Sequence, residues 1–248
     1  MILEPYEGPV TAQPTAPELM ASELRRAIAL GAFEPGARLP TERTLADRLG
    51  VSRMTVRAAM RILASDGLVT TVRGRTGGTV VTSTAGMEHP SAASSIEAFA
   101  SQVRDNLECR LAIEPLAAEL AAVRATEQER AALLDLVGMT ANGIRHYRML
   151  DSRLHMAIAR AAHNEALVPI IETLRSEFFL WADAAWTRLD WNALAPHRQD
   201  FGHSHQALVH AISDGQQHEA RLLMHEHIEQ GLIQVKEVIA AALAGDGG

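Results

Sequence analysis

Strand-forming sequence is confined to one short stretch of this 248-residue chain, and this restriction constrains the fold more than any other feature. Two runs rich in β-branched residues, 68–72 and 79–82, flank the segment RGRTGG, which favours a hairpin with a glycine-rich, basic tip. Every other apolar pattern follows the helical period. The chain is therefore predicted to be mainly α, with one two-stranded sheet.

Three helical patterns precede this hairpin, at residues 18–32, 41–49 and 52–65. Thr41 and Ser52 stand where they can cap the second and third helices, and Gly50 follows the second. Three short helices followed by a two-stranded wing indicate a winged helix-turn-helix.

The sequence after a Ser/Thr/Ala/Pro-rich linker shows only helical periods, at residues 96–123, 127–141, 145–163, 165–188, 197–214 and 216–243. They predict an all-α helical bundle, and Pro115 should kink or divide the first of its helices. The predicted organisation is a flexible arm (1–14), the winged helix-turn-helix (15–83), the linker (84–95), the bundle (96–243) and a flexible tail (244–248).

Charge separates the two predicted domains. The net charge is −7, yet residues 15–85 hold ten Arg and no Lys against six acidic residues, a balance of +4. Residues 86–248 hold 13 basic and 22 acidic residues, a balance of −9. A basic small domain joined to an acidic large one suggests nucleic-acid contact by the former.

The third helical pattern has the features of a DNA recognition helix. Arg53, Arg57 and Arg61 are spaced by four and form one basic stripe, whereas Val56, Ala59, Met60 and Leu63 form the opposite, apolar face. A guanidinium group can pair with guanine or bind phosphate. The alternative is a solvated basic face, and the basic wing tip, Arg73 and Arg75, favours DNA.

Four residues of the predicted bundle form a candidate metal site: Asp151, His155, His205 and His227. Each is at helical spacing from apolar neighbours, so all four should point inward. A single histidine is more often a core or surface residue than a ligand. A carboxylate and three imidazoles buried together, however, would be costly unless they bound a divalent cation.

Several classes of protein are excluded or disfavoured. No apolar stretch is long enough to span a membrane, and no secretory signal precedes the first helix. The single cysteine, Cys109, rules out an internal disulfide framework and a cysteine zinc site. The expectation is a cytoplasmic protein with no membrane partner.

The segment GAFEPGARLPTERTLADRLGVSRMTVRAAMRILASDGLVTTVRGRTGGTVV strongly resembles the N-terminal domain of the GntR family of bacterial transcriptional regulators. The positions that match the family's DNA contacts are Arg43, Ser52, Arg53, Thr55, Arg57, Arg73 and Gly74. Two positions depart from the family pattern. Thr44 replaces a common Glu that would complete a capping box with Thr41, and Met54 occupies a recognition position that is often polar.

The second region resembles the metal-binding C-terminal (FCD) domain of the FadR subfamily. DSRLHMAIARAAHN matches an Asp-x-x-Phe-His helix with Leu154 in place of Phe, and HQALVHAI and ARLLMHEHI match the later histidine motifs. The resemblance implies a divalent ion, zinc first and nickel or manganese as alternatives, on Asp151, His155, His205 and His227. It also implies that Arg110 binds an effector carboxylate; the alternative is a surface ion pair with Glu114.

These observations predict a homodimeric transcriptional repressor and not an enzyme. It would bind a palindromic operator in double-stranded DNA, and a small organic acid at the metal site would modulate that binding. Two alternatives remain. The cluster could make the bundle a metal-dependent hydrolase, or the regulator could sense the metal ion itself.

Overall fold

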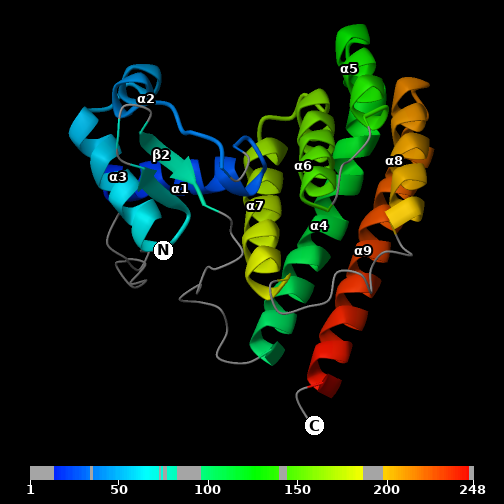
Figure 1. The fold of residues 1–248 in the computed structure, drawn as a ribbon. Helices are drawn as coiled ribbons and strands as arrows, with labels where there is room; N and C mark the ends of the chain where they lie inside the picture. The colour runs from blue at the N-terminus through cyan, green and yellow to red at the C-terminus, as the bar shows by residue number, and fades with distance from the viewer. Residues whose placement is uncertain are drawn as a thin grey trace, which may run out of the picture.

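The computed structural model describes residues 14–33, 36–72, 74, 77–82, 96–139, 144–186 and 198–245. The predicted linker, the predicted arm apart from Pro14, and Arg73 and Arg75 of the wing tip lie outside these residues. A small N-terminal head and a larger helical bundle lie side by side (Figure 1). The head contains α1 (Ala16–Ala29), α2 (Glu42–Leu49), α3 (Arg53–Ser65), β1 (Val69–Val72) and β2 (Gly78–Val81). The bundle contains α4 (Ile96–Arg124), α5 (Glu127–Val137), α6 (Ile144–Ala161), α7 (Leu167–Trp186), α8 (Arg198–Ser213) and α9 (Gln217–Gly245).

Local sequence signals fix the ends of the head helices. The Thr41 hydroxyl accepts a hydrogen bond from the Thr44 amide at the start of α2, and Ser52 does the same for the Thr55 amide at the start of α3. Gly50 ends α2 in the left-handed conformation, with φ of 66°. The predicted three-helix arrangement is confirmed, and α1, α2 and α3 enclose one apolar core built around Val56, Ala59 and Leu63.

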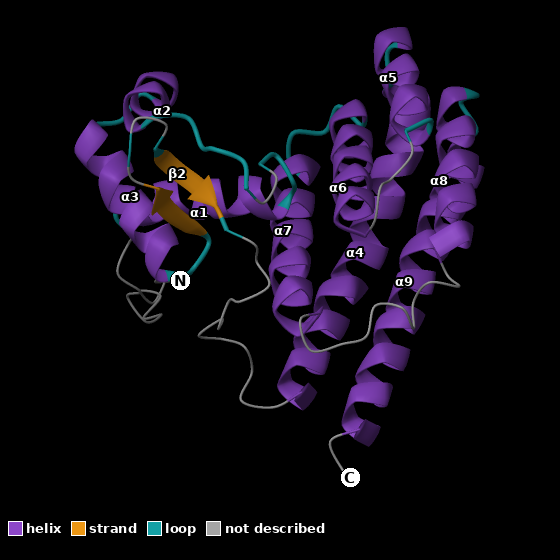
Figure 2. Ribbon diagram, in the orientation of Figure 1, coloured by secondary structure: helices purple, strands orange, loops and turns teal. Residues whose placement is uncertain are grey.

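The wing is a regular antiparallel hairpin (Figure 2). Val69 pairs with Val81, and Val72 pairs with Gly78 at the end nearer the tip. Arg38 forms an isolated bridge to Val80, so the segment that enters α2 extends the sheet by one residue pair. The mainly helical fold with one two-stranded sheet is thus as predicted.

The bundle is organised around α4 and α9, which pack against each other along much of their length. Its principal core joins α4, α5, α6, α8 and α9, with Ile158, Leu208 and Ile212 fully buried at its centre. The sequence predicted that Pro115 would kink or divide its helix. Pro115 lies within α4 and the helix continues through it, so the prediction of a division is wrong. α9 extends to Gly245, two residues into the predicted tail. Within the described residues, no helix is long and apolar enough to cross a membrane.

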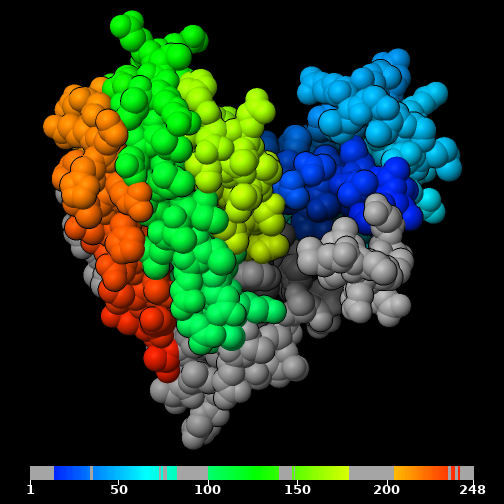
Figure 3. All heavy atoms as spheres, turned by 180° about the vertical axis from the view of Figure 1, so that it is seen from behind, coloured from blue at the N-terminus to red at the C-terminus, as the bar shows by residue number. Residues whose placement is uncertain are grey.

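The head contacts the bundle through α1, which packs against α7. Figures 1 and 3 both show α1 and α7 adjacent, with α7 on the side of the bundle that faces the head. At the end of α1, Gly31 lies so close to α6 that a Cβ added there would be 2.5 Å from Cγ of Met149. The head is therefore in direct contact with α6 and α7 of the bundle within one chain.

Candidate metal site and DNA-reading surface

The structure brings the four predicted metal ligands together at one point. Asp151 and His155 come from α6, His205 from α8 and His227 from α9. The Nε2 atom of His227 lies 3.1 Å from Nε2 of His155 and 3.2 Å from Nε2 of His205. Oδ1 of Asp151 is 3.1 Å from Nε2 of His205 and 3.5 Å from Nε2 of His155. All three imidazoles are buried, and Asp151 is partly exposed.

These separations suit four ligands of one cation. Metal–ligand bonds of about 2.1 Å place adjacent ligand atoms roughly 3.0 to 3.4 Å apart, depending on the coordination geometry. Burial lowers the pKa of His205, and burial, together with the repulsion that the two imidazoles would feel if both were protonated, lowers the pKa of His227 to about 3. Both imidazoles are therefore neutral near pH 7, which is the form that binds a metal. The donor set thus fits a divalent cation.

A second layer of polar contacts orients these ligands. Nδ1 of His155 is hydrogen-bonded to the carboxylate of Glu114, and Nδ1 of His227 lies 3.1 Å from the hydroxyl of Ser204. Because a carboxylate accepts, His155 donates from Nδ1, and its Nε2 is the nitrogen that faces the cluster. Carboxylate–histidine contacts of this kind are typical of metal sites.

Arg175 from α7 completes this layer. Its side chain is fully buried, forms an ion pair with the second carboxylate oxygen of Asp151, and donates to Oε2 of Glu114 at 3.3 Å. Burial alone would raise the pKa of Glu114, but the charges of Arg110 and Arg175 outweigh it and hold that pKa well below its usual value. Burial would likewise raise the pKa of Asp151, but the charge of Arg175 is the principal effect that holds this pKa well below its usual value. Both carboxylates are therefore ionised.

Arg110 lies on α4, beside this network. It donates from Nε to Glu114, as the sequence alternative anticipated, but the pair is buried and not at the surface. Its Cζ also lies 5.2 Å from the centroid of the Phe178 ring. Sequence reasoning missed Glu114 and Arg175 as parts of the site. The available signal was their position on apolar helix faces, where a charge is not expected without a buried partner.

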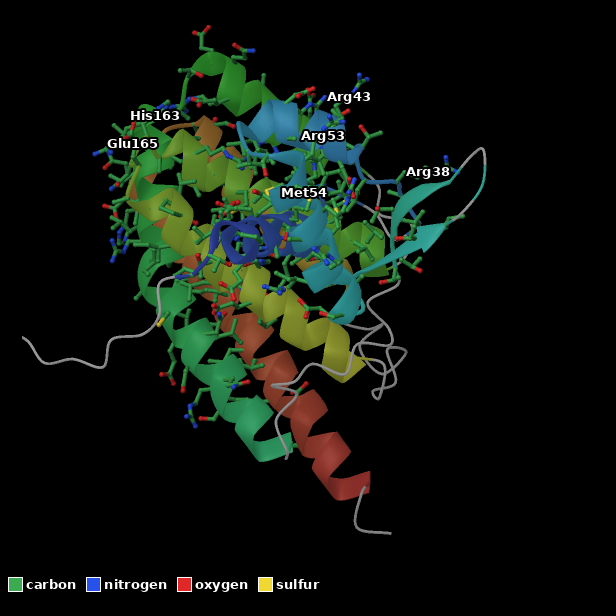
Figure 4. All side chains as sticks on the ribbon, turned by 90° about the vertical axis from the view of Figure 1, so that its left-hand side faces the viewer. Arg38, Arg43, Arg53, Met54, His163 and Glu165 are labelled. Carbon is green, nitrogen blue, oxygen red and sulfur yellow. The ribbon has the colours of Figure 1, made fainter. Side chains whose placement is uncertain are left out.

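Two of the predicted DNA-reading residues, Arg43 and Arg53, lie on the head, on the side away from the bundle (Figure 4). Arg43 near the start of α2 and Arg53 at the start of α3 are exposed and point away from the head core. Ser52 and Thr55 form the α3 cap, and their hydroxyls lie 2.9 Å apart. Gly74 is exposed with φ of 119°, whereas its predicted companion Arg73 lies outside the described residues.

One member of the predicted basic stripe has a partner that spacing did not predict. Arg57 donates from Nε and Nη2 to both carboxylate oxygens of Glu42 on α2, at 2.8 to 3.2 Å. The hydrogen bonds to Glu42 raise the pKa of Arg57, and the negative charge of Glu42 adds a smaller effect in the same direction. This pair uses the side-on edge of the guanidinium, Nε and Nη2, so the end-on fork keeps one hydrogen on Nη1 and one on Nη2 for DNA. Thr44, where relatives often have Glu, keeps its amide hydrogen bond to Thr41 and adds a hydroxyl contact at 2.9 Å.

Two family models match the chain. The model "Bacterial regulatory proteins, gntR family" matches residues 18–81, which cover the head, and the FCD domain model matches residues 105–230, which include all four candidate metal ligands. The second match spans half of the chain.

Relatives of known name match over most of their length. The Uxu operon regulator of Haemophilus influenzae is 29% identical, and the match covers 87% of this chain and 80% of that protein. The Exu regulon transcriptional regulator of Escherichia coli is also 29% identical, with 87% and 83% covered. A third relative, 30% identical over 84% of this chain and 82% of its own, bears a name that assigns it to the L-lactate dehydrogenase operon of Escherichia coli.

A solved structure shares the fold. The Escherichia coli protein McbR/YncC superposes with a TM-score of 0.53 at 18% identity, covering 91% of this chain and 99% of that one. The matched families and named relatives are regulators and not enzymes, which removes the hydrolase alternative. The chain is a DNA-binding transcriptional regulator with an FCD domain, and it belongs to the GntR family of bacterial regulatory proteins.

Proposed function

We propose that this regulator is a homodimeric repressor of the FadR subfamily, whose operator affinity is set by a small carboxylate bound at the metal site. The observation that carries the proposal is the convergence of Asp151, His155, His205 and His227 within 4.8 Å, beside a buried arginine. A purely structural cluster would have no need of three imidazoles directed at one point.

Asp151, His155, His205 and His227 would hold the ion, which we expect to be zinc, with nickel or manganese as alternatives. Such an ion, when bound, supplies open coordination positions to a carboxylate. Glu114 and Ser204 would fix the ring orientations of His155 and His227 through their Nδ1 contacts. The ligand set would therefore be held in place before the effector arrives.

Arg110 is the residue that we assign to the effector. Within the described part of the chain its hydrogen bonds use Nε alone, so its two Nη groups remain available for a carboxylate. Burial lowers the pKa of Arg110, while Glu114 opposes that effect. A ligand carboxylate would add a second negative partner in the same buried environment. One relative is named for an L-lactate dehydrogenase operon, which makes L-lactate a rational first probe.

Arg175 offers a route from this site to the DNA-binding head. It contacts both Asp151 and Glu114 from α7, and α7 packs against α1 of the head. A ligand that changed the position of either carboxylate would alter the forces on Arg175 and hence on α7. Effector and operator are coupled if the ligand prefers one head position over the other.

On the DNA side, we assign base reading to Arg53, phosphate contact to Arg43 and Arg57, and capping and backbone contact to Ser52 and Thr55. Arg73 and Gly74 of the wing would contact the adjacent groove or backbone. In the assignment of Arg57 to phosphate, its Nε–Nη2 edge stays on Glu42, and Nη1 with the second Nη2 hydrogen contacts the phosphate. Two heads related by a two-fold axis would read the two halves of a palindrome.

The test has two stages. Genomic fragments retained by the purified protein at physiological salt identify the operator, and fluorescence anisotropy then measures operator affinity with and without L-lactate. We expect lactate or a related carboxylate to weaken binding of the metal-loaded protein, and an Arg110→Gln variant to lose that response while still binding the operator. If a panel of small carboxylates produces no heat in calorimetry with the metal-loaded protein, the effector proposal fails.

A matched pair of variants distinguishes the effect of losing a metal ligand from the effect of losing any histidine of the bundle. His205→Ala removes a predicted ligand, whereas His210→Ala removes an exposed imidazole from the same helix. We expect only the first to abolish the carboxylate response. Operator affinity that follows zinc concentration with no carboxylate present would instead support a regulator that senses the metal itself.

A further inference from the structure

The first turn of α3 carries an apolar side chain on the surface that the head turns away from the bundle. Met54 is 63% exposed, more than any other large hydrophobic residue described. It follows the cationic Arg53, labelled with it in Figure 4, and precedes Thr55, whose amide donates to the N-cap Ser52. A thioether chain in this position gains nothing from water and contributes nothing to the head core, which includes Val56, Ala59 and Leu63.

The helical period shows where Met54 points. At about 100° per residue, the mean direction of the buried positions Val56, Ala59, Met60 and Leu63 lies roughly 190° from Met54 around the α3 axis. Met54 is therefore within about 10° of the direction opposite the core. Arg53 and Arg57 lie at its side, about 100° and 60° around the same axis. Of these residues, Met54 projects most directly from the head.

The charges around Met54 indicate what this surface meets. Arg43, Arg53 and Arg61 are exposed cations on α2 and α3, and Arg38 is exposed beside the wing. A surface with this charge is complementary to DNA, and the N-terminal turn of a recognition helix is the part that approaches base edges in the major groove. The apolar side chain would thus be enclosed by arginines that bind phosphates and polar base atoms.

We propose that Met54 is a specificity-determining residue that contacts the C5-methyl group of a thymine in each operator half-site. Thymine alone among the four standard bases presents a methyl group in the major groove, and apolar side chains recognise it by contact. Polar base edges would lose water against the thioether chain and gain no hydrogen bond from it, so they are disfavoured. The inference rests on the proposed role of α3 in reading the major groove.

The experiment isolates that methyl group. Selection of bound duplexes from a random DNA pool gives the half-site, and each thymine in it is then replaced singly by deoxyuridine, which lacks only the C5-methyl. Burying one methyl group corresponds to about a fourfold change in affinity. We expect one thymine per half-site whose replacement weakens binding about fourfold, and about fifteenfold when both half-sites are changed. The other thymines should tolerate uracil.

Two variants connect the effect to the residue. In Met54→Ala the sensitive thymine should become indifferent to uracil, since the partner of the methyl group is gone. Leu19→Ala removes another exposed apolar side chain, 53% exposed on α1, and should leave the uracil profile unchanged. Because both residues are exposed, neither substitution threatens the fold, and urea denaturation checks this.

The outcomes separate this inference from the function on which it rests. A selected half-site whose thymines all tolerate uracil would overturn the role of Met54 and leave the DNA-reading role of α3 intact. A sensitive thymine that stays sensitive in Met54→Ala would assign the methyl contact to another residue. Failure to enrich any sequence, with the protein folded and metal-loaded, would overturn base reading by α3 and the Met54 contact together.

Discussion

Substitution of Gly31 by alanine tests the contact between head and bundle, which no local sequence pattern indicated. Gly31 follows α1 with φ of 75°, a conformation that costs an L-residue about 1 to 2 kcal/mol. An added Cβ would also lie 2.5 Å from Cγ of Met149 and 3.0 Å from its Cβ. Ordinary contact requires the two elements to separate by about 1 Å, and overpacking of this kind costs about 1 to 3 kcal/mol. The total expected loss is about 2 to 5 kcal/mol.

Gly50 provides the matched control. It has a similar φ of 66°, but an alanine Cβ there would meet nothing within 4 Å. Gly50→Ala should therefore lose only the conformational part, about 1 to 2 kcal/mol. The difference between the two variants in urea denaturation measures the contact with α6. Hydrogen exchange provides a second readout, because release of the head should raise exchange in α1 and α7 in Gly31→Ala alone.

Two results would refute this reasoning. If Gly31→Ala and Gly50→Ala lose the same free energy of unfolding and show the same exchange in α7, then Gly31 does not contact Met149 in solution. The route from the metal site through Arg175 and α7 to the head would then lack its final step.

Three further substitutions test the two sites. His205→Ala should lose bound metal, measured by atomic emission after gel filtration, and lower the Tm of the zinc-loaded protein; unchanged metal content would contradict the ligand set. Arg53→Ala should weaken operator binding by about 1 to 3 kcal/mol in anisotropy titrations and leave the heat of carboxylate binding unchanged, and a matching loss of both would be inconsistent with separate sites. Glu42→Gln removes a negative charge beside Arg57, so DNA should bind more tightly, with a steeper dependence on salt. Weaker binding would instead mean that Glu42 is needed to orient Arg57.

Most of the secondary structure could be predicted because it depends on neighbours in sequence. The caps at Thr41 and Ser52 use atoms three residues away, and Thr126 forms a full capping box with Glu129 at the start of α5. Pro115 was expected to kink or divide its helix, and division was wrong, because the packing of α4 against α9 is a tertiary constraint that local propensity does not include.

The candidate site, too, could be predicted from the sequence only in part. Periodicity alone placed Asp151 and His155 on one helix face, since residues four apart lie one above the other. Periodicity also turned His205 and His227 inward, and the family resemblance picked out the same two residues, but the convergence of their Nε2 atoms is visible only in the fold.

By itself, the sequence determined the helices, the wing, the charge division between the head and the rest of the chain, and the residue types available to bind a metal. The helices and the wing follow from periods of two and 3.6 residues and from short-range caps, and the other two properties follow from composition alone. The tertiary structure alone decided that Glu114 orients His155, that Arg175 joins Asp151 to α7, and that Arg57 is held by Glu42. These partners are 41, 24 and 15 residues apart, and the packing of whole helices, not local spacing, sets which side chains meet at such separations.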